Sequence, residues 1–138
     1  MTHPAVYQAD DFTPPADKFT VREDPGIWYV LAFDGERNTE LLGLFVLVQL
    51  SPICWEIHTR LLPGSWGKQA AEAARGILAW LWERTPCLRL VTAVPAYNRL
   101  AIRFAERAGL KVFGNNERSY LKGGVLHDQI LLGISKPV

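Results

Sequence analysis

Three polar side chains alternate with apolar residues or threonine in the segment ICWEIHTRLL, residues 53–62: Glu56, His58 and Arg60. Residues two apart in an extended strand point to the same side, so these three share one face. An imidazole exchanges protons near neutral pH, and a neighbouring carboxylate can orient it and stabilise its charged form. Glu56 and His58 are therefore a candidate acid–base pair in which either group could be the base. The alternative is a paired polar face that only holds the sheet to the N-terminal arm.

A second candidate site lies in LLPGSWGKQAAEA, residues 61–73. The segment leads from an apolar strand through a Pro-Gly turn into an alanine-rich helix, and the first amides of a helix attract anions. A P-loop is excluded, because Gly64, Gly67 and Lys68 have the wrong spacing and Gln69 carries no hydroxyl for magnesium. A GxGxxG dinucleotide pattern is also absent. The segment is either a phosphate-binding loop or only a strand-to-helix connection.

The elements that position these residues follow from hydrophobic patterning. Residues 27–33 and 41–50 are rich in β-formers, and the Asp-Gly of the intervening DGERNTE predicts an antiparallel hairpin. Residues 53–62 continue as a third strand. Apolar residues recur every three or four positions from Lys68 to about Arg84, which predicts an amphipathic helix that ends before Pro86.

The second half of the chain predicts a strand at 87–94, a helix after Asn98 that ends at Gly109, and two final strands in LKVFG and LHDQILLGIS joined by a Gly- and Asn-rich loop. The order β-β-β-α-β-α-β-β predicts an α/β (α+β) fold with a mixed, mostly antiparallel sheet flanked by helices. We expect one domain over residues 1–138, in which residues 1–20 form an irregular arm.

Composition restricts the class of protein. Fifteen basic and fourteen acidic residues give no signature of a dedicated nucleic-acid or membrane-surface binder. No secretory signal and no membrane-length apolar stretch are recognisable, so we expect a cytoplasmic protein without a membrane partner. The two cysteines, Cys54 and Cys87, lie in separate apolar segments, which argues against a disulfide framework and against a metal site.

From Leu41 to Ser135 the sequence resembles the GNAT superfamily of acyl-CoA-dependent N-acyltransferases. In that family an apolar strand end leads into Arg/Gln-x-x-Gly-x-Gly/Ala, whose backbone holds the coenzyme A pyrophosphate. Here Trp66 stands in place of the usual Arg or Gln, Gln69 replaces the first glycine, and Ala71 fits the last position. The resemblance implies that the coenzyme contacts the end of this strand and the start of the helix that follows it. The residues are Leu61, Leu62, Trp66, Gly67, Lys68, Gln69, Ala70 and Ala71.

The second helix carries a further part of the resemblance. The family's helix begins with Asn, with Ala three positions on and Gly eleven positions on, followed by an apolar residue; Asn98, Ala101, Gly109 and Leu110 match. The resemblance implies that Asn98 contacts the pantetheine arm. Asn is also a good helix N-cap in any fold, so a purely structural role is the alternative.

The resemblance implies transfer of an acetyl group from acetyl-CoA to a primary amine, and it places catalytic carboxylates on the strand of Glu56 and His58. A base is needed, because an ammonium of pKa about 10.4 must lose its proton before it attacks the thioester. Many members place a tyrosine acid seven residues after the helix Asn, but that position is Ala105 here. Tyr97 or Tyr120 could assist instead, or the thiol, with a pKa of about 8.5, could leave as thiolate.

The amine acceptor is not identified by the sequence: a small molecule, a peptide and a nucleobase all stay open, as does a homodimer. The alternative function is a catalytically inactive GNAT-fold protein that binds an acyl-CoA or only a protein partner. The short N-terminal part resembles small phage or prophage members of the superfamily.

Overall fold

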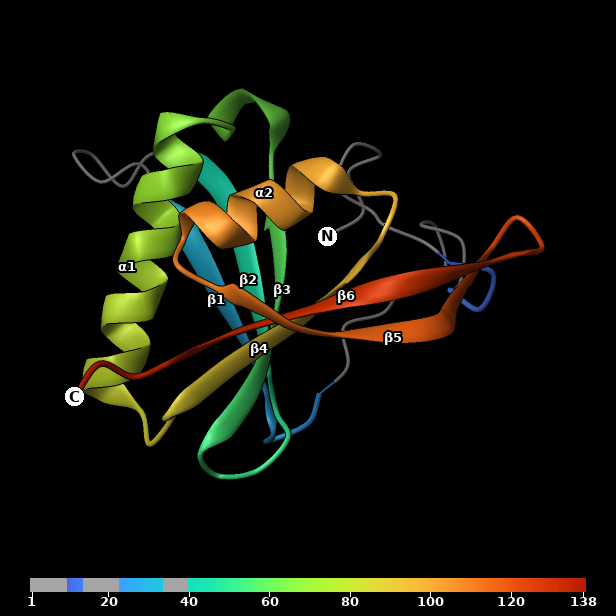
Figure 1. Ribbon diagram of the computed structural model, residues 1–138. Helices are drawn as coiled ribbons and strands as arrows, with labels where there is room; N and C mark the ends of the chain where they lie inside the picture. The colour runs from blue at the N-terminus through green and yellow to red at the C-terminus, as the bar shows by residue number, and fades with distance from the viewer. Residues whose placement is uncertain (1–9, 14–22, 34–39) are drawn as a thin grey trace.

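The computed structural model describes residues 10–13, 23–33 and 40–138 (Figure 1). This part of the chain forms six strands, two α-helices and a 3-10 turn. The strands are β1 (Ile27–Phe33), β2 (Leu41–Gln49), β3 (Cys54–Leu61), β4 (Arg89–Pro95), β5 (Lys111–Lys122) and β6 (Val125–Ser135). The helices are α1 (Lys68–Arg84) and α2 (Arg99–Arg107), and the 3-10 turn η2 (Pro63–Ser65) precedes α1.

The strands form one mixed sheet in the order β1-β2-β3-β4-β6-β5. Neighbouring strands are antiparallel except β3 and β4, which are parallel and joined through α1. The predicted mixed, mostly antiparallel sheet and the antiparallel pairing of β1 with β2 are confirmed. The hairpin connection between them and most of the predicted N-terminal arm lie outside the described residues.

Both helices pack on the same face of the sheet. Ile77 and Leu81 of α1 lie in a buried cluster with Leu90 of β4, whereas Ala105 of α2 lies in a second cluster with Val94 of β4. Leu90 and Val94 are four residues apart on one strand, so they point to the same side. The opposite face of the sheet is therefore free of these two helices, and it carries the polar residues of β3.

The sheet divides at the boundary between β3 and β4. Their ladder covers only residues 54–56 against 89–91, while β3 continues along β2 to Leu61 and β4 continues along β6 to Pro95. Beyond the ladder the Thr92 hydroxyl donates a 3.0 Å hydrogen bond to the Ile57 carbonyl. The two halves of the sheet thus diverge into a V, and β4, β5 and β6 run at a steep angle to β1–β3 (Figure 1).

The predicted Gly- and Asn-rich loop between the last two strands is wrong in its Asn part. Asn115 and Asn116 belong to β5, and the extra residues before Tyr120 form a bulge with Arg118 at φ 51°. The Asp128 carboxylate of β6 accepts hydrogen bonds from the Arg118 amide, at 2.9 Å, and from the Asn115 side chain, at 3.2 Å. These bonds satisfy polar groups that would otherwise favour a loop, and only Gly-Gly at 123–124 forms the turn.

Candidate active site

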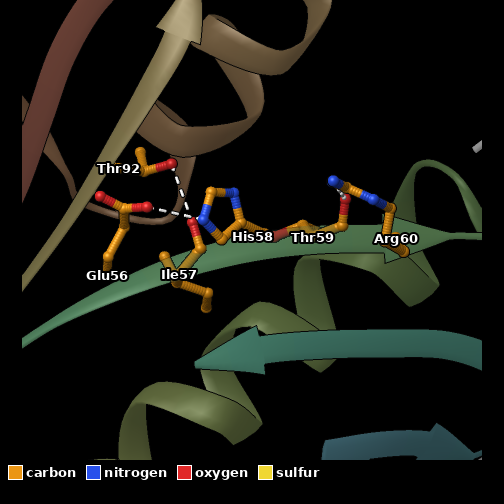
Figure 2. Close-up of polar contacts among 6 residues, drawn as sticks. All are labelled: Glu56, Ile57, His58, Thr59, Arg60 and Thr92. Carbon is orange, nitrogen blue, oxygen red and sulfur yellow. Dashed lines mark hydrogen bonds and ion pairs between the residues drawn. The ribbon is translucent and has the colours of Figure 1, made fainter. Parts of the chain in front are cut away.

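Glu56 and His58 form a close pair on β3. His58 Nε2 lies 2.6 Å from Glu56 Oε1. The Glu56 side chain is 30% exposed and the His58 side chain 35%. Figure 2 shows Glu56, His58 and Arg60 on one side of the strand and Ile57 on the other, which confirms the shared face. Because Ile57 is buried against α1, this face points away from the helices.

The electrostatics of the pair favour an ionised carboxylate. The hydrogen bond from His58 lowers the pKa of Glu56 and outweighs the opposing effect of burial, and the charge interaction with His58 lowers it further. An ionised carboxylate can only accept hydrogen bonds, so His58 Nε2 must be the donor. In the tautomer that carries its proton on Nε2, the imidazole keeps Nδ1 as a proton acceptor, which is the arrangement a general base requires.

A cleft opens beside this pair where β3 and β4 diverge. It lies between the two strands and the facing sides of both helices, and its lining includes His58, Arg60, Ala74, Thr92, Pro95 and Phe104. The lining is mostly apolar. Since His58 lies on the face opposite the helices and Ala74 belongs to α1, the cleft connects the helix side of the sheet to the polar face of β3.

The start of α1 leaves backbone amides without partners inside the helix. Gly67 is the N-cap residue at φ 97° and ψ −125°, no side chain caps the helix, and its first turn holds no acidic residue. The amides of residues 68–70 therefore point out of the helix end, and the Lys68 side chain adds a positive charge nearby. Gln69 is helical, so it avoids the strain that a positive φ would impose at the position of the family's glycine.

The predicted coenzyme residues divide into two groups by their surroundings. The Trp66 indole donates a 2.9 Å hydrogen bond to the Leu61 carbonyl, and the Leu62 amide donates to the Leu42 carbonyl at 2.8 Å, so this strand end is fixed by the protein itself. Ala70 is buried in the core, and the Ala71 amide donates to the Gly67 carbonyl. The first amides of the helix are left for a ligand, and the Trp66 side chain beside them is exposed.

Asn98 caps α2, as the sequence predicts. Its Oδ1 accepts a 3.2 Å hydrogen bond from the Ala101 amide. No hydrogen bond of the side-chain NH₂ group is found within the described part of the chain. The residue can therefore cap the helix and still donate to a ligand in the adjacent cleft.

Tyr97 lies at the end of β4 in an aromatic cluster. Its ring centre is 4.8 Å from that of His127 on β6 and 6.3 Å from that of Tyr120 on β5. Sequence reasoning missed His127. The alternation in LHDQILLG was the signal that could have found it: Leu132 packs under α2, so His127 faces the opposite side. The parallel direction of β3 and β4 puts this cluster at the same end of the sheet as Arg60.

Comparison with known proteins identifies the class of protein. The family described as acetyltransferase (GNAT) domain matches residues 4–111, and the chain belongs to this family. A search of curated proteins finds no match. None of the helices in the described ranges is long and apolar enough to cross a membrane.

Solved structures agree with this fold. A chimera of the spermidine N-acetyltransferase SpeG from Vibrio cholerae with hSSAT has a TM-score of 0.72 and 18% identity, covering 81% of this chain and 68% of that one. A GNAT-family acetyltransferase from Bacillus anthracis has a TM-score of 0.66 and 20% identity, covering 72% and 61%. Another SpeG structure is a complex with manganese ions. Among the residues described for this chain, no group of three or more His, Cys, Asp and Glu could hold a metal ion.

Proposed function

We propose that the chain is an N-acetyltransferase that transfers an acetyl group from acetyl-CoA to a primary amine. The observation that carries the proposal is the Glu56–His58 pair, at 2.6 Å, beside the cleft where β3 and β4 diverge. A carboxylate-oriented imidazole serves amine activation, because the amine must be neutral to attack. Two free cysteine thiols, Cys54 and Cys87, support a reducing, cytoplasmic location for this reaction.

The residues around the cleft suit acetyl-CoA. The uncapped amides of residues 68–70 and the Lys68 side chain would bind the pyrophosphate, since a helix N-terminus favours anions. The mostly apolar cleft would take the thin pantetheine arm, with the Asn98 side-chain NH₂ group as a donor to it. When bound, acetyl-CoA supplies the activated thioester carbonyl.

The proton path follows from the hydrogen bond of His58. Nδ1 accepts the proton of the ammonium, and Glu56 stabilises the resulting imidazolium through Nε2–H. The neutral amine forms the new C–N bond, the C–S bond breaks, and the second proton that the nitrogen loses balances the one that the departing thiolate takes up. Burial raises the pKa of Tyr120 to about 12, which makes it a weak proton donor to the departing thiolate. Tyr97 is the candidate that remains for that role.

One observation favours the alternative, a binder without catalysis. Ala105, at the position where many family members place a tyrosine acid, is buried in the core beside Val94. No side chain at that position can protonate the thiolate. The experiment must therefore separate binding from turnover.

The test measures acetyl-CoA binding by calorimetry and CoA release over a panel of amines, for wild type, Glu56→Gln and His58→Gln. We expect each variant to lose roughly 10²–10⁴-fold in kcat/KM, while its affinity for acetyl-CoA stays within a few-fold. Glu83→Gln, which removes an exposed carboxylate from α1, is the matched control and should keep full activity. Full turnover in both site variants would reject the assigned base, and binding without turnover in the wild type would favour the alternative.

A further inference from the structure

The polar face of β3 carries a guanidinium that the proposed proton path does not use. Arg60 lies two residues beyond His58 on the same side of the strand, and it also lines the cleft. Its side chain turns back along the strand, where Nη1 donates a 3.1 Å hydrogen bond to the Thr59 carbonyl (Figure 2). Among the residues that the structure describes, no carboxylate forms an ion pair with Arg60.

The acidic groups on β3, on β6 and in residues 10–13 form hydrogen bonds with residues other than Arg60, although the charge of Asp10 also acts on Tyr120. Glu56 is paired with His58, and Asp128 accepts two hydrogen bonds from the β5 bulge. Asp10 accepts hydrogen bonds from the Phe12 amide and the Thr13 hydroxyl. Asp11 accepts from the amides of residues 123 and 124 at the β5–β6 turn.

The group that faces Arg60 across the divided sheet is a phenol. The Arg60 charge acts on Tyr120 of β5 and opposes the rise of its pKa, but burial prevails and raises it to about 12. Tyr120 is therefore neutral at pH 7, and burial lowers the pKa of Arg60. Another cation lies beside the aromatic cluster: Lys122 Nζ is 5.7 Å from the centre of the Tyr97 ring.

We propose that Arg60 binds an anionic group on the acceptor, with Lys122 adding a second positive charge at the rim, so that the substrate is a primary amine bearing a carboxylate or a phosphate. A guanidinium matches either group in a bidentate way, and a partly buried cation that forms no ion pair with any described residue favours an anionic ligand. Tyr97, Tyr120 and His127 supply aromatic surface beside that group. This inference rests on the proposed acetyltransferase function.

The same charges disfavour a polycationic acceptor. Spermidine, the substrate named for the SpeG structures, carries only positive groups, which Arg60 and Lys122 would repel. The acceptor end of this chain therefore selects against the substrate of its structural neighbours, although the fold is shared.

Matched acceptors test the proposal in wild type. Phenylalanine is compared with phenethylamine, O-phosphoethanolamine with ethanolamine, and spermidine serves as the polycation. We expect the anionic member of at least one pair to have the higher kcat/KM by about 10–100-fold; the first pair reports carboxylate recognition and the second phosphate recognition. Arg60→Gln should remove that preference, Arg60→Lys should keep part of it, and Arg103→Gln, on the exposed side of α2, should leave it unchanged.

Calorimetry of phenylalanine and O-phosphoethanolamine in the presence of CoA gives a readout that needs no turnover, and melting temperatures report whether the variants fold. Anion binding that depends on Arg60, without CoA release, would support the inference while rejecting the proposed function. Acetylation of spermidine, phenethylamine or ethanolamine as fast as the acceptors that carry a carboxylate or a phosphate would overturn the inference alone. Absence of binding by both anionic amines would overturn it as well.

Discussion

The imidazole of His58 has one nitrogen committed to Glu56 and the other available for a proton. This division follows from a strand: alternation puts the two side chains on one face, and the buried Ile57 between them fixes which face that is. The same alternation adds Arg60 at the next position. A single strand therefore carries the proposed base, its proposed partner and the group that we propose to bind the acceptor.

The pair also predicts how stability depends on pH. The pKa of Glu56 is lowered in the folded protein from its ordinary 4.5, so the folded state favours the ionised form. This contribution is present above the unfolded pKa and is lost as pH falls through the lower folded pKa. We expect Glu56→Gln to be less stable than wild type at neutral pH by less than about 1 kcal/mol, and the difference to vanish in acid.

Thermal or urea unfolding over the range from neutral to strongly acidic pH measures this difference. Glu83→Gln removes an exposed carboxylate, and its stability should fall in acid in the same way as that of the wild type. A constant gap between Glu56→Gln and wild type at every pH would show that the hydrogen bond does not favour the ionised carboxylate.

At the scale of elements, the start of α1 rests on one residue. Gly67 is at φ 97° and ψ −125°, a conformation that residues with a Cβ rarely adopt, although the space around it is open. Gly64 is four residues from the helix start, is equally open and has no positive φ. The two glycines therefore allow backbone strain to be separated from side-chain bulk.

We expect Gly67→Ala to cost on the order of 1–3 kcal/mol through this strain and to weaken acetyl-CoA binding by at least about tenfold, or 1.4 kcal/mol, because the amides at the helix start would move. Gly64→Ala should change neither the melting temperature nor the affinity. Calorimetry and thermal unfolding decide the matter. Unchanged affinity in a folded Gly67→Ala variant would leave the segment as a strand-to-helix connection without a phosphate.

Local patterns predict the elements whose causes are local. The helix at Lys68–Arg84 follows from apolar spacing and a downstream proline, and the Asn98 cap follows from the chemistry of one side chain. The β5 bulge was missed because it depends on Asp128 of the neighbouring strand, which no window of sequence around the asparagines contains. An Asn-rich segment resembles a loop until a carboxylate across the ladder satisfies its donors.

The candidate site shows the same division. Glu56 and His58 are two residues apart, so parity alone predicted that they face one side. Tyr97, Tyr120 and His127 come together only because β6 lies between β4 and β5, and strand order is not encoded in any single segment. Which charged groups come near Arg60 also depends on how the strands are assembled, so the sequence alone does not predict it.

At the scale of the whole molecule, the divided sheet brings β3 and β5 to opposite sides of one opening. Arg60 and Tyr120 influence one another across it, while Tyr97 and the Asp10 charge act on the same phenol. Every one of these groups comes from a different segment of the chain. The ionisation of Tyr120 therefore reports how the two halves of the sheet and the short segment at residues 10–13 are assembled.

Burial, Tyr97 and Asp10 together raise the pKa of Tyr120 from 10.0 to about 12, against the opposing charge of Arg60. Because the folded pKa of Tyr120 is raised, its protonated form contributes to the free energy of unfolding. This contribution is complete below the unfolded pKa and is lost as pH rises from 10.0 towards about 12. Because the folded pKa of about 12 lies close to the unfolded value of 10.0, the two states differ by less than one bound proton, so the slope should stay below the limiting ~1.4 kcal/mol per pH unit. We expect wild-type stability in denaturant to fall through this window and that of Tyr120→Phe to fall less.

Tyr97→Phe should shift the last tyrosinate absorbance step to lower pH, since it removes a group that raises the pKa of Tyr120. An identical alkaline decline in wild type and Tyr120→Phe would mean that the pKa of Tyr120 is the same in the folded and the unfolded protein, and that the two halves of the sheet do not enclose the phenol.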